Sequence, residues 1–451
     1  MYYTDRNEVG FDLIHRKNGR KSIKMADLKP HILVISQYFH PETFRINDMA
    51  REWVKRGYKV TVLTGIPNYP MGKYFEGYDK KHRTRENWNG VDIIRIPLIA
   101  RGNSRNKVLN AVGMTANYFS FVKSGKRWVK SKEAAELKPD YIYTFEVSPM
   151  TQALIGVWYK KRYHIPHYLY VTDLWPENVE SVTGIHSKVI IYPIQKMVDY
   201  IYRNTDHIFT CSKSFIPRIE SRGIEKSKIE YWPQYAEDFY KPMKPEGDLI
   251  PRDDVLNFIF AGSVGYAQGI GILVRAAETL KREDKRVRFV IIGDGRYLDV
   301  LLGKIKEAEV SDYFLFIPRK PAEEIPKYLA YADALLITLS KNDVFSITLP
   351  AKVQSCFACG KPIIVSADGE AQMAVEEAKA GLYSDAEDLD GFVQNIRAFI
   401  KTQQSERDKM GINALNYARE NFDKIRQMDK LDEAFARGGN KECHHLMEQR
   451  F

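Results

Sequence analysis

The feature that most constrains the fold is a series of short apolar runs, each followed by an amphipathic helical stretch. HILVISQYF (31–39) lacks the polar–apolar alternation of a half-exposed strand, so it predicts a buried parallel strand. Residues 46–57 follow with apolar side chains at helical spacing and end at Gly57, and KVTVLT (59–64) predicts a second strand. This β-α-β order indicates an α/β fold with a doubly wound sheet.

The strand pattern stops and then restarts, which indicates two domains. In the first half we expect further strands at 92–98, 141–145, 166–171 and 207–212. Residues 236–256 are rich in Pro, Gly and charge and predict a linker. NFIFAGS (257–263) opens a second series, continued at 288–295, 313–319, 334–339 and 361–367. We therefore predict Rossmann-like domains at 30–235 and 257–412, with a ligand held between their facing strand ends.

The positive charge belongs to the first half of the chain. Residues 1–240 carry 38 Lys and Arg against 25 Asp and Glu, whereas residues 241–451 carry 30 against 33. Such asymmetry suggests that the first half faces an acidic partner, either a membrane surface or a nucleic acid. No recognisable nucleic-acid module is present, so we expect no nucleic-acid partner. Residues 101–132 mix basic and aromatic side chains, which fits a helix on an anionic membrane or a core helix with a basic face.

The sequence shows no sign of a membrane span, a signal peptide or a disulfide framework. No apolar stretch approaches the ~20 residues that span a bilayer, and the N-terminus lacks a signal-peptide layout. We expect a cytoplasmic protein that touches the inner face of the cell membrane only from its surface. Residues 1–29 predict a basic, flexible extension, within which Met25 is an alternative start. We interpret Cys356 and Cys359 as buried residues rather than a redox or metal pair, and Cys443, His444 and His445 as a weak metal signal.

Two glycine turns follow successive strands of the second domain. FAGSVGYAQG (260–269) contains Gly262, Gly265 and Gly269 before a helix, where glycine lets backbone N–H groups approach an anion. In VIIGDG (290–295), Gly293 and Gly295 flank Asp294. The alternative is that these glycines serve only tight turn geometry. Together the two turns predict a phosphate-binding edge on the second domain.

The segment 344–366 is the most informative part of the second half. Pro350 fits the first turn of a helix, and Lys352 and Gln354 fall on its opening turns. A helix start that carries a lysine can hold a diphosphate through its dipole and its charge, although Lys352 could also be a solvated helix residue. Arg319 and Lys320, which follow another strand, are further cationic candidates or part of a surface loop.

Candidate residues on the first domain also follow strands. In VTDLWPENV (171–179), Asp173 comes at the end of a strand, where it faces the ligand or begins a helix as an N-cap. In the turn after the first strand, Arg45 is a candidate phosphate contact and Glu42 a candidate acceptor contact. The alternative for both is ordinary helix-entry chemistry.

Four segments resemble glycosyltransferase family 4, a group of retaining enzymes with the two-domain GT-B fold that use nucleotide-sugar donors. They are YFHPETFRINDMA, VTDLWPENV, FAGSVGYAQG and LPAKVQSCFACGKPIIVSADGE, in that order over about residues 30–435. Within the family they are similar to the branch of O-antigen and capsule transferases that includes N-acetylfucosaminyltransferases. The resemblance implies a nucleotide-sugar donor, which by branch is a UDP-sugar, and an acceptor linked to a polyprenyl diphosphate lipid. It also implies that helices in 413–451 cross back to the first domain.

The strand-end positions and the resemblance together assign roles to named positions. The candidate catalytic residues are Asp173, Lys352 and Gln354, and the candidate acceptor contacts are Glu42 and Arg45. The implied donor-binding residues are Gly262, Ser263, Val264, Gly265, Gln268, Gly269, Gly293, Asp294, Gly295, Arg319, Lys320, Ser346, Leu349 and Pro350. We expect no metal and no cofactor beyond the donor substrate, and we leave open whether the chain forms a homo-oligomer.

The chain also departs from the family pattern. Ser346 and Gln354 stand where most members have two glutamates, and Ser263 and Gln268 stand where most have an arginine and a lysine. Because charge-assisted bonds to phosphate are about twice as strong as neutral ones, other cations must replace the lost charges. The alternatives are a GT-B epimerase that acts on a nucleotide sugar, and a non-catalytic nucleotide-sugar-binding partner of a polysaccharide assembly complex.

Overall fold

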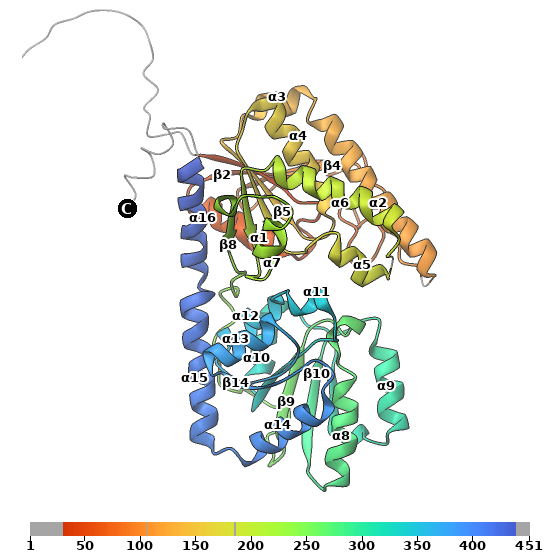
Figure 1. Ribbon diagram of the computed structural model, residues 1–451, viewed down its shortest axis with the longest axis vertical. Coiled ribbons are helices and arrows are strands. Elements are labelled where there is room, and N and C mark those ends of the chain that lie inside the picture. Colours follow the sequence, from red (N-terminus) through yellow and green to blue (C-terminus); the bar gives the residue numbers. More distant parts are fainter. Residues whose placement is uncertain (1–29, 105, 185, 439–451) are drawn as a thin grey trace, which may run out of the picture.

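The computed structural model describes residues 30–104, 106–184 and 186–438. It contains two α/β domains, and a nearly continuous helical column formed by α15 and α16 runs along both of them (Figure 1). The predicted extension at 1–29, its alternative start at Met25 and the residues Cys443, His444 and His445 lie outside the described residues.

The first domain is built on a doubly wound sheet of eight strands. Its order is β3-β4-β2-β1-β5-β6-β7-β8, and every neighbouring pair is parallel except β3 with β4. The strands are β1 (His31–Ile35), β2 (Lys59–Gly65), β3 (Arg85–Trp88), β4 (Val91–Ile96), β5 (Tyr141–Glu146), β6 (His167–Val171), β7 (His207–Thr210) and β8 (Ile229–Tyr231). The helices are α1 (Arg45–Lys55), α2 (Lys107–Trp128), α3 (Lys132–Leu137), α4 (Ala153–Tyr163), α5 (Glu177–Thr183), α6 (Lys188–Arg203) and α7 (Phe215–Glu220).

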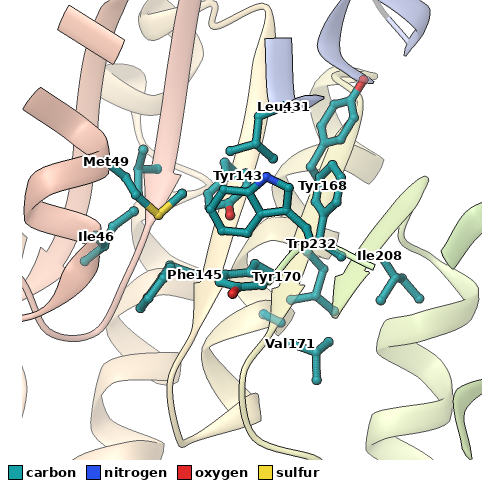
Figure 2. Close-up of a cluster of buried hydrophobic side chains, with 14 of the residues drawn as sticks. Ile46, Met49, Tyr143, Phe145, Tyr168, Tyr170, Val171, Ile208, Trp232 and Leu431 are labelled. Atoms are coloured by element: carbon teal, nitrogen blue, oxygen red, sulfur yellow. The ribbon is translucent and has the colours of Figure 1, made fainter. Parts of the chain in front are cut away.

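Amphipathic helices bury the sheet from both sides. Helix α1 directs Ile46 and Met49 into an aromatic-rich core beneath β5 and β6, where Tyr143 and Tyr170 are completely buried (Figure 2). On the opposite face, α2 and α4 cover Leu33 and its neighbours on the central strands. Burial on both faces explains why the central strands are continuous apolar runs.

The second domain has a smaller sheet in which all pairs are parallel. Its order is β11-β10-β9-β12-β13-β14. The strands are β9 (Leu256–Ala261), β10 (Val287–Ile292), β11 (Phe314–Ile317), β12 (Ala334–Thr338), β13 (Ile363–Ser366) and β14 (Gly381–Ser384). The helices are α8 (Ile272–Arg282), α9 (Leu298–Glu307), α10 (Ile325–Leu329), α11 (Asp343–Ser346), α12 (Ala351–Ala358), α13 (Glu370–Ala378), α14 (Leu389–Lys401) and α15 (Gln404–Asn421).

The C-terminal helices connect the two domains. Helix α15 packs on the second domain, where Tyr417 contacts Phe357 with 5.3 Å between ring centroids. Helix α16 (Lys424–Gly438) packs on the first, where Phe435 stacks on Tyr141 at 4.9 Å. The chain thus crosses between the domains twice, through the linker after β8 and at the junction of α15 and α16 (Figure 1).

Every strand expected from the sequence has a counterpart, but three strands were not expected. β3 is polar, and β8 and β14 are three and four residues long, so none gives the continuous apolar run of a buried strand. Cys211, Cys356 and Cys359 are free and buried. Within the described ranges, no helix is both long and apolar enough to cross a membrane, and no group of three or more His, Cys, Asp or Glu residues could hold a metal ion.

Candidate active site

The carboxyl edges of the two sheets face each other. The loop after β7 makes hydrogen bonds across the domains: Leu349 N donates to Ser212 Oγ at 2.6 Å, and Ser214 N donates to Glu370 Oε1 at 2.7 Å. Leu349 precedes α12 and Glu370 begins α13, so both contacts reach the carboxyl edge of the second sheet. In doubly wound sheets this edge is where ligands bind.

The first glycine loop carries backbone donors that have no partner. Among the described residues, the N–H groups of Ser263 and Gly265 have no hydrogen-bond acceptor. A Cβ added to Gly265 would meet only the Ser263 hydroxyl at 3.9 Å, and one on Gly262 would meet only the end of the Lys352 side chain. The space beside these two glycines is therefore open to a ligand, and free N–H groups suit an anion.

The other glycines of these turns are explained by packing. A Cβ on Gly293 would lie 1.9 Å from the Gly262 carbonyl oxygen, and one on Gly295 would lie 2.2 Å from that of Val264. Gly269 has φ +58° and packs against the backbone of Leu339. These contacts favour the tight-geometry alternative for Gly269, Gly293 and Gly295, which hold the first loop in place.

Val264 and Asp294 differ in what they offer to a ligand. The Val264 side chain is completely buried, and its N–H donates to the Asp294 carbonyl at 2.9 Å. The Asp294 carboxylate accepts from Gly295 N at 2.7 Å. Val264, although predicted to bind the donor, therefore presents no unused N–H group, whereas Asp294 is exposed and its Oδ2 has no hydrogen-bond partner among the described residues.

This packing gives a stability prediction. Gly293→Ala should lower the melting temperature by at least several degrees, because the new methyl group would overlap a backbone oxygen at a φ of +152°. The matched control is Gly303→Ala in the middle of α9, where a Cβ would meet nothing within 4 Å and a helix gains about 0.5–1 kcal/mol from the change. Equal melting temperatures for the two variants would contradict the packing role of Gly293.

Lys352 lies beside the open part of the loop. It belongs to the first turn of α12, its Nζ donates to Gln268 Oε1, and it stands 4.2 Å from the centroid of the Phe260 ring. Burial lowers the pKa of Lys352 to about 8. Among the described residues it has no carboxylate partner, so its charge is available to a bound anion.

The remaining donor-side residues near α12 are less accessible. Gln354 is completely buried, and with its amide assigned so that nitrogen donates, it bonds the carbonyls of Pro350 and Ala351 at 3.1 and 2.8 Å. We therefore correct its predicted catalytic role. Because the Gln354 side chain has no exposed surface, it cannot contact a substrate in this structure, and it stabilises the start of α12. The Leu349 side chain is buried, and Ser346 Oγ donates to Asp343 O at 2.8 Å.

Pro350 lies one position earlier than expected. It is the N-cap residue of α12 and not a residue of its first turn, with extended φ and ψ of −67° and 143°.

Arg319 and Lys320 follow β11, two strands from the glycine loop in the sheet order. Arg319 is exposed and has no ion pair among the described residues, and Lys320 lies 5.8 Å from the Tyr328 ring.

On the first domain, Asp173 is hydrogen-bonded to Glu146, an acid that was not among the predicted site residues. Asp173 follows β6, and its Oδ2 accepts from Ser148 N at 2.9 Å. Its own N–H donates to Glu146 Oε2 at 3.3 Å, at the end of β5. Asp173 does not begin α5, which starts at Glu177, so the N-cap alternative does not apply.

Glu146 is completely buried, and its Oε1 has no hydrogen-bond partner in the described structure. Burial raises the pKa of Glu146 well above its usual value, and the Asp173 charge raises it further. The sequence could have indicated Glu146 in the same way as Asp173. Glu146 is the last residue of β5, and Asp173 lies two residues after the end of β6. Burial also raises the pKa of the Cys211 thiol, which donates to the Thr172 carbonyl next to Asp173, to about 12. Glu370 of the second domain accepts from Ser214 N in the loop that follows Cys211.

The two predicted acceptor contacts are engaged elsewhere. Arg45 donates to the Tyr235 carbonyl and to Glu237 Oε2, so it fixes the interdomain linker and its charge is already paired with a carboxylate. Glu42 is 2% exposed, and its carboxylate accepts from the backbone N–H groups of Phe39, Asn68 and Tyr69. Both predictions are corrected: these residues position loops and do not face a ligand.

Glu42 gives a second stability prediction. Burial raises its pKa to about 7. Because the folded protein then binds the proton more tightly than the unfolded chain, Glu42 stabilises the fold at low pH and loses that stabilisation as the pH rises from about 4.5 to 7. Glu42→Gln should destabilise by about 1–3 kcal/mol, since its amide NH₂ cannot accept a backbone bond. The loss in melting temperature should be larger at pH 5 than at pH 8, whereas Glu323→Gln at an exposed site should show no such trend.

Comparison with known proteins decides the class of this site. The glycosyl transferase 4-like domain model matches residues 43–234, and the model of glycosyl transferases group 1 matches residues 248–417. Sucrose-phosphate synthase from Thermosynechococcus elongatus has the same fold, with a TM-score of 0.70 and 15% identity over 91% of this chain and 99% of that one. The chain is a glycosyltransferase of the GT-B fold.

Curated relatives and a UDP complex extend the comparison. The glycosyltransferase is 22% identical over 363 residues to the putative colanic acid biosynthesis glycosyl transferase WcaI of Escherichia coli, covering 76% of this chain and 84% of the relative. It is 23% identical over 397 residues to the alpha-monoglucosyldiacylglycerol synthase of Streptococcus pneumoniae, covering 84% and 79%. Anabaena HepE, solved with UDP, has a TM-score of 0.63 at 15% identity over 91% and 100% of the two chains. These matches favour a transferase over the epimerase and non-catalytic alternatives.

Proposed function

We propose that this glycosyltransferase moves a sugar, with retention, from a nucleoside diphosphate to a lipid-linked saccharide in the synthesis of a bacterial surface polysaccharide. One observation carries the donor half of the proposal. The free N–H groups of Ser263 and Gly265 lie in the same loop that Lys352 borders, and together they supply dipoles and one positive charge for a diphosphate.

We propose UDP as the nucleotide of the donor and an N-acetylated deoxyhexose as its sugar. The complex of HepE with UDP supports the choice of nucleotide, because HepE has the same fold. The resemblance of the VTDLWPENV and LPAKVQSCFACG segments to the N-acetylfucosaminyltransferase branch supports the sugar. In this proposal Lys352 and the loop amides stabilise the leaving diphosphate without a metal ion.

The first domain would hold the acceptor. Asp173 lies at its carboxyl edge, where a carboxylate can orient the acceptor hydroxyl or stabilise positive charge that develops on the sugar ring. The leaving phosphate would take the acceptor proton. Glu146 contributes by holding the backbone of Asp173, since its Oε2 accepts from that residue's N–H.

An exposed apolar surface on the first domain supports a lipid-linked acceptor. On α2, Val108, Val112 and Phe119 are 60–70% exposed at helical spacing, and Lys123 follows one turn later. On α6, Val189 is 84% exposed. Helix α4 packs against both α2 and α6, so these residues belong to one side of the domain (Figure 1). Exposed apolar residues among lysines suit the inner face of an anionic membrane.

The names of the curated relatives agree with this acceptor class. WcaI is described as acting in colanic acid biosynthesis, and the pneumococcal relative as an alpha-monoglucosyldiacylglycerol synthase. The first name refers to the biosynthesis of colanic acid and the second to a glucosylated diacylglycerol. We therefore propose an O-antigen or capsule role, with the enzyme peripherally bound at the cytoplasmic side of the inner membrane.

The test is transfer itself. The purified enzyme should move radiolabelled sugar from one member of a panel of UDP-sugars into the organic phase of a bacterial lipid extract, and the product should keep the donor's anomeric configuration by NMR. Transfer into the aqueous phase only would overturn the lipid-linked acceptor. Isomerised donor without any transfer would restore the epimerase alternative.

A further inference from the structure

A cation without a counter-ion lies on the acceptor side of the first domain. Arg101, in the loop between β4 and α2, has its guanidinium 5.6 Å from the centroid of the Tyr69 ring and donates to Met114 Sδ at 3.2 Å. Among the described residues it forms no ion pair, whereas most other buried or half-buried arginines of this domain face a carboxylate. A half-buried, unpaired guanidinium is available to an anion from outside the protein.

The position of Arg101 is fixed by a built scaffold. Its backbone N–H donates to Asn68 Oδ1 at 3.1 Å, and a Cβ on Gly113 of α2 would lie 2.3 Å from its carbonyl oxygen. The neighbouring Gly102 N donates to the Gly72 carbonyl at 2.8 Å, and both glycines have positive φ. The loop after β2, the loop after β4 and α2 are thus packed together around this arginine.

Buried hydrogen bonds join the loop of Arg101 to the loop that holds Asp173. Asn68 Oδ1, which accepts from Arg101 N, also accepts from Asn117 Nδ2, and Asn117 Oδ1 accepts from Gln37 Nε2. Gln37 N donates to Gln152 Oε1, and Gln152 Nε2 donates to the carbonyl of Val147, the residue before the Ser148 N–H that binds Asp173. The two loops therefore belong to one hydrogen-bonded cluster of the first domain.

Exposed apolar side chains lie on the segments that meet at this loop. Met71, two residues after Tyr69, is 55% exposed, Ile99, two residues before Arg101, is 51% exposed, and Leu109, one helical turn before Gly113, is 61% exposed. An unpaired cation within an exposed apolar rim matches one chemistry, that of a phosphate joined to a hydrocarbon chain.

We propose that Arg101 binds the phosphate that joins the acceptor saccharide to its lipid chain, and that Met71, Ile99 and Leu109 receive the first part of that chain. This inference rests on the proposed function, because it names the part of a lipid-linked acceptor that this site recognises. Tyr69 holds the guanidinium plane, and the sugar extends from the phosphate towards Asp173.

The test measures binding of farnesyl diphosphate by calorimetry, with farnesol and inorganic pyrophosphate as probes for the chain and the phosphate alone. Arg101→Gln should weaken farnesyl diphosphate binding about tenfold or more while leaving farnesol binding unchanged. The matched control is Arg162→Gln: Arg162 also lies on a tyrosine ring, 5.7 Å from that of Tyr163, has no ion pair in the described structure, and ends α4 at the opposite edge of the sheet. That variant should bind within about twofold of wild type.

The outcomes separate this inference from the proposed function. If wild type binds farnesyl diphosphate and Arg101→Gln binds it equally, the role of Arg101 is wrong while a lipid-linked acceptor stands. If wild type binds farnesyl diphosphate no better than farnesol, the lipid-linked acceptor itself fails. If pyrophosphate binds as tightly and responds equally to Arg101→Gln, the site takes free phosphate and the lipid assignment is overturned. Stabilisation by a nucleotide should be the same in Arg101→Gln and wild type, since the donor loop lies on the other domain.

Discussion

Lys352→Met is expected to lower kcat/KM for the donor by about 100-fold or more. The substitution keeps the length of an apolar side chain beside Phe260 but removes the positive charge next to the loop amides. The loop from Gly262 to Gly269 contains no Lys or Arg of its own, so Lys352 has no near substitute there. Loss of one preorganised donor to a developing charge costs about 10²–10³ in rate. Initial rates with varied donor concentration measure the effect.

The control and the pH dependence sharpen this prediction. Lys306→Met on the exposed face of α9 removes the same charge away from the loop and should leave kcat/KM within about twofold. Because burial lowers the pKa of Lys352 to about 8, wild-type kcat/KM should fall as the pH rises through about 8, and the variant should lack that limb. A Lys352→Met enzyme with wild-type kcat/KM would remove the lysine from the site.

Asp173→Asn is expected to lower kcat about 100-fold while the KM for the donor changes little. Asparagine can keep the bond from Ser148 N through its amide oxygen, so the loop stays in place while the negative charge is lost. A carboxylate that orients a hydroxyl or stabilises developing positive charge contributes about 10²–10⁴ in rate. Initial rates at saturating donor and acceptor isolate kcat.

Glu146→Gln is the matched control for this charge. Burial and the Asp173 charge raise the pKa of Glu146 and so favour its protonated form, which an amide resembles, so Glu146→Gln should preserve activity within a few-fold. Glu146 also changes how the free energy of unfolding depends on pH, in the direction opposite to a carboxylate in an ion pair. The stabilisation by Glu146 is lost as the pH rises above its pKa in the unfolded chain, near 4.5, and Glu146→Gln should not show this loss. Equal loss of kcat in the Asp173 and Glu146 variants would show that the loop, and not the Asp173 charge, matters.

Much of the fold could be predicted because it depends on local pattern. Apolar runs such as 31–39 and 257–263 became central strands, and the glycine turn at 262–265 lies where a turn after such a strand must lie. The roles of Arg45 and Glu42 could not be predicted in this way. Arg45 bonds a linker carbonyl 190 positions away, and Glu42 accepts N–H groups from the loop after β2. Such partners are fixed by the assembled fold and leave no local trace.

Accessibility was the second quantity hidden from the sequence. Gln354 and Lys352 are two residues apart on one helix start, yet Gln354 is completely buried while Lys352 reaches the glycine loop. The roles of Gly269, Gly293 and Gly295 were likewise undecided until the backbone atoms opposite them were known. A glycine that approaches another backbone and one that approaches a ligand look the same in a sequence.

The central claim is that a nucleoside diphosphate binds the second domain at the loop beside Lys352. The most direct measurement is the melting temperature of wild type and Lys352→Met with UDP, GDP, ADP and dTDP, each with and without magnesium. A ligand at 100 times its Kd adds about 2.7 kcal/mol, which shifts the transition measurably. We predict that UDP alone stabilises wild type, equally with and without magnesium, and that the shift is largely lost in Lys352→Met. No shift of wild type with any of the four nucleotides would contradict the account.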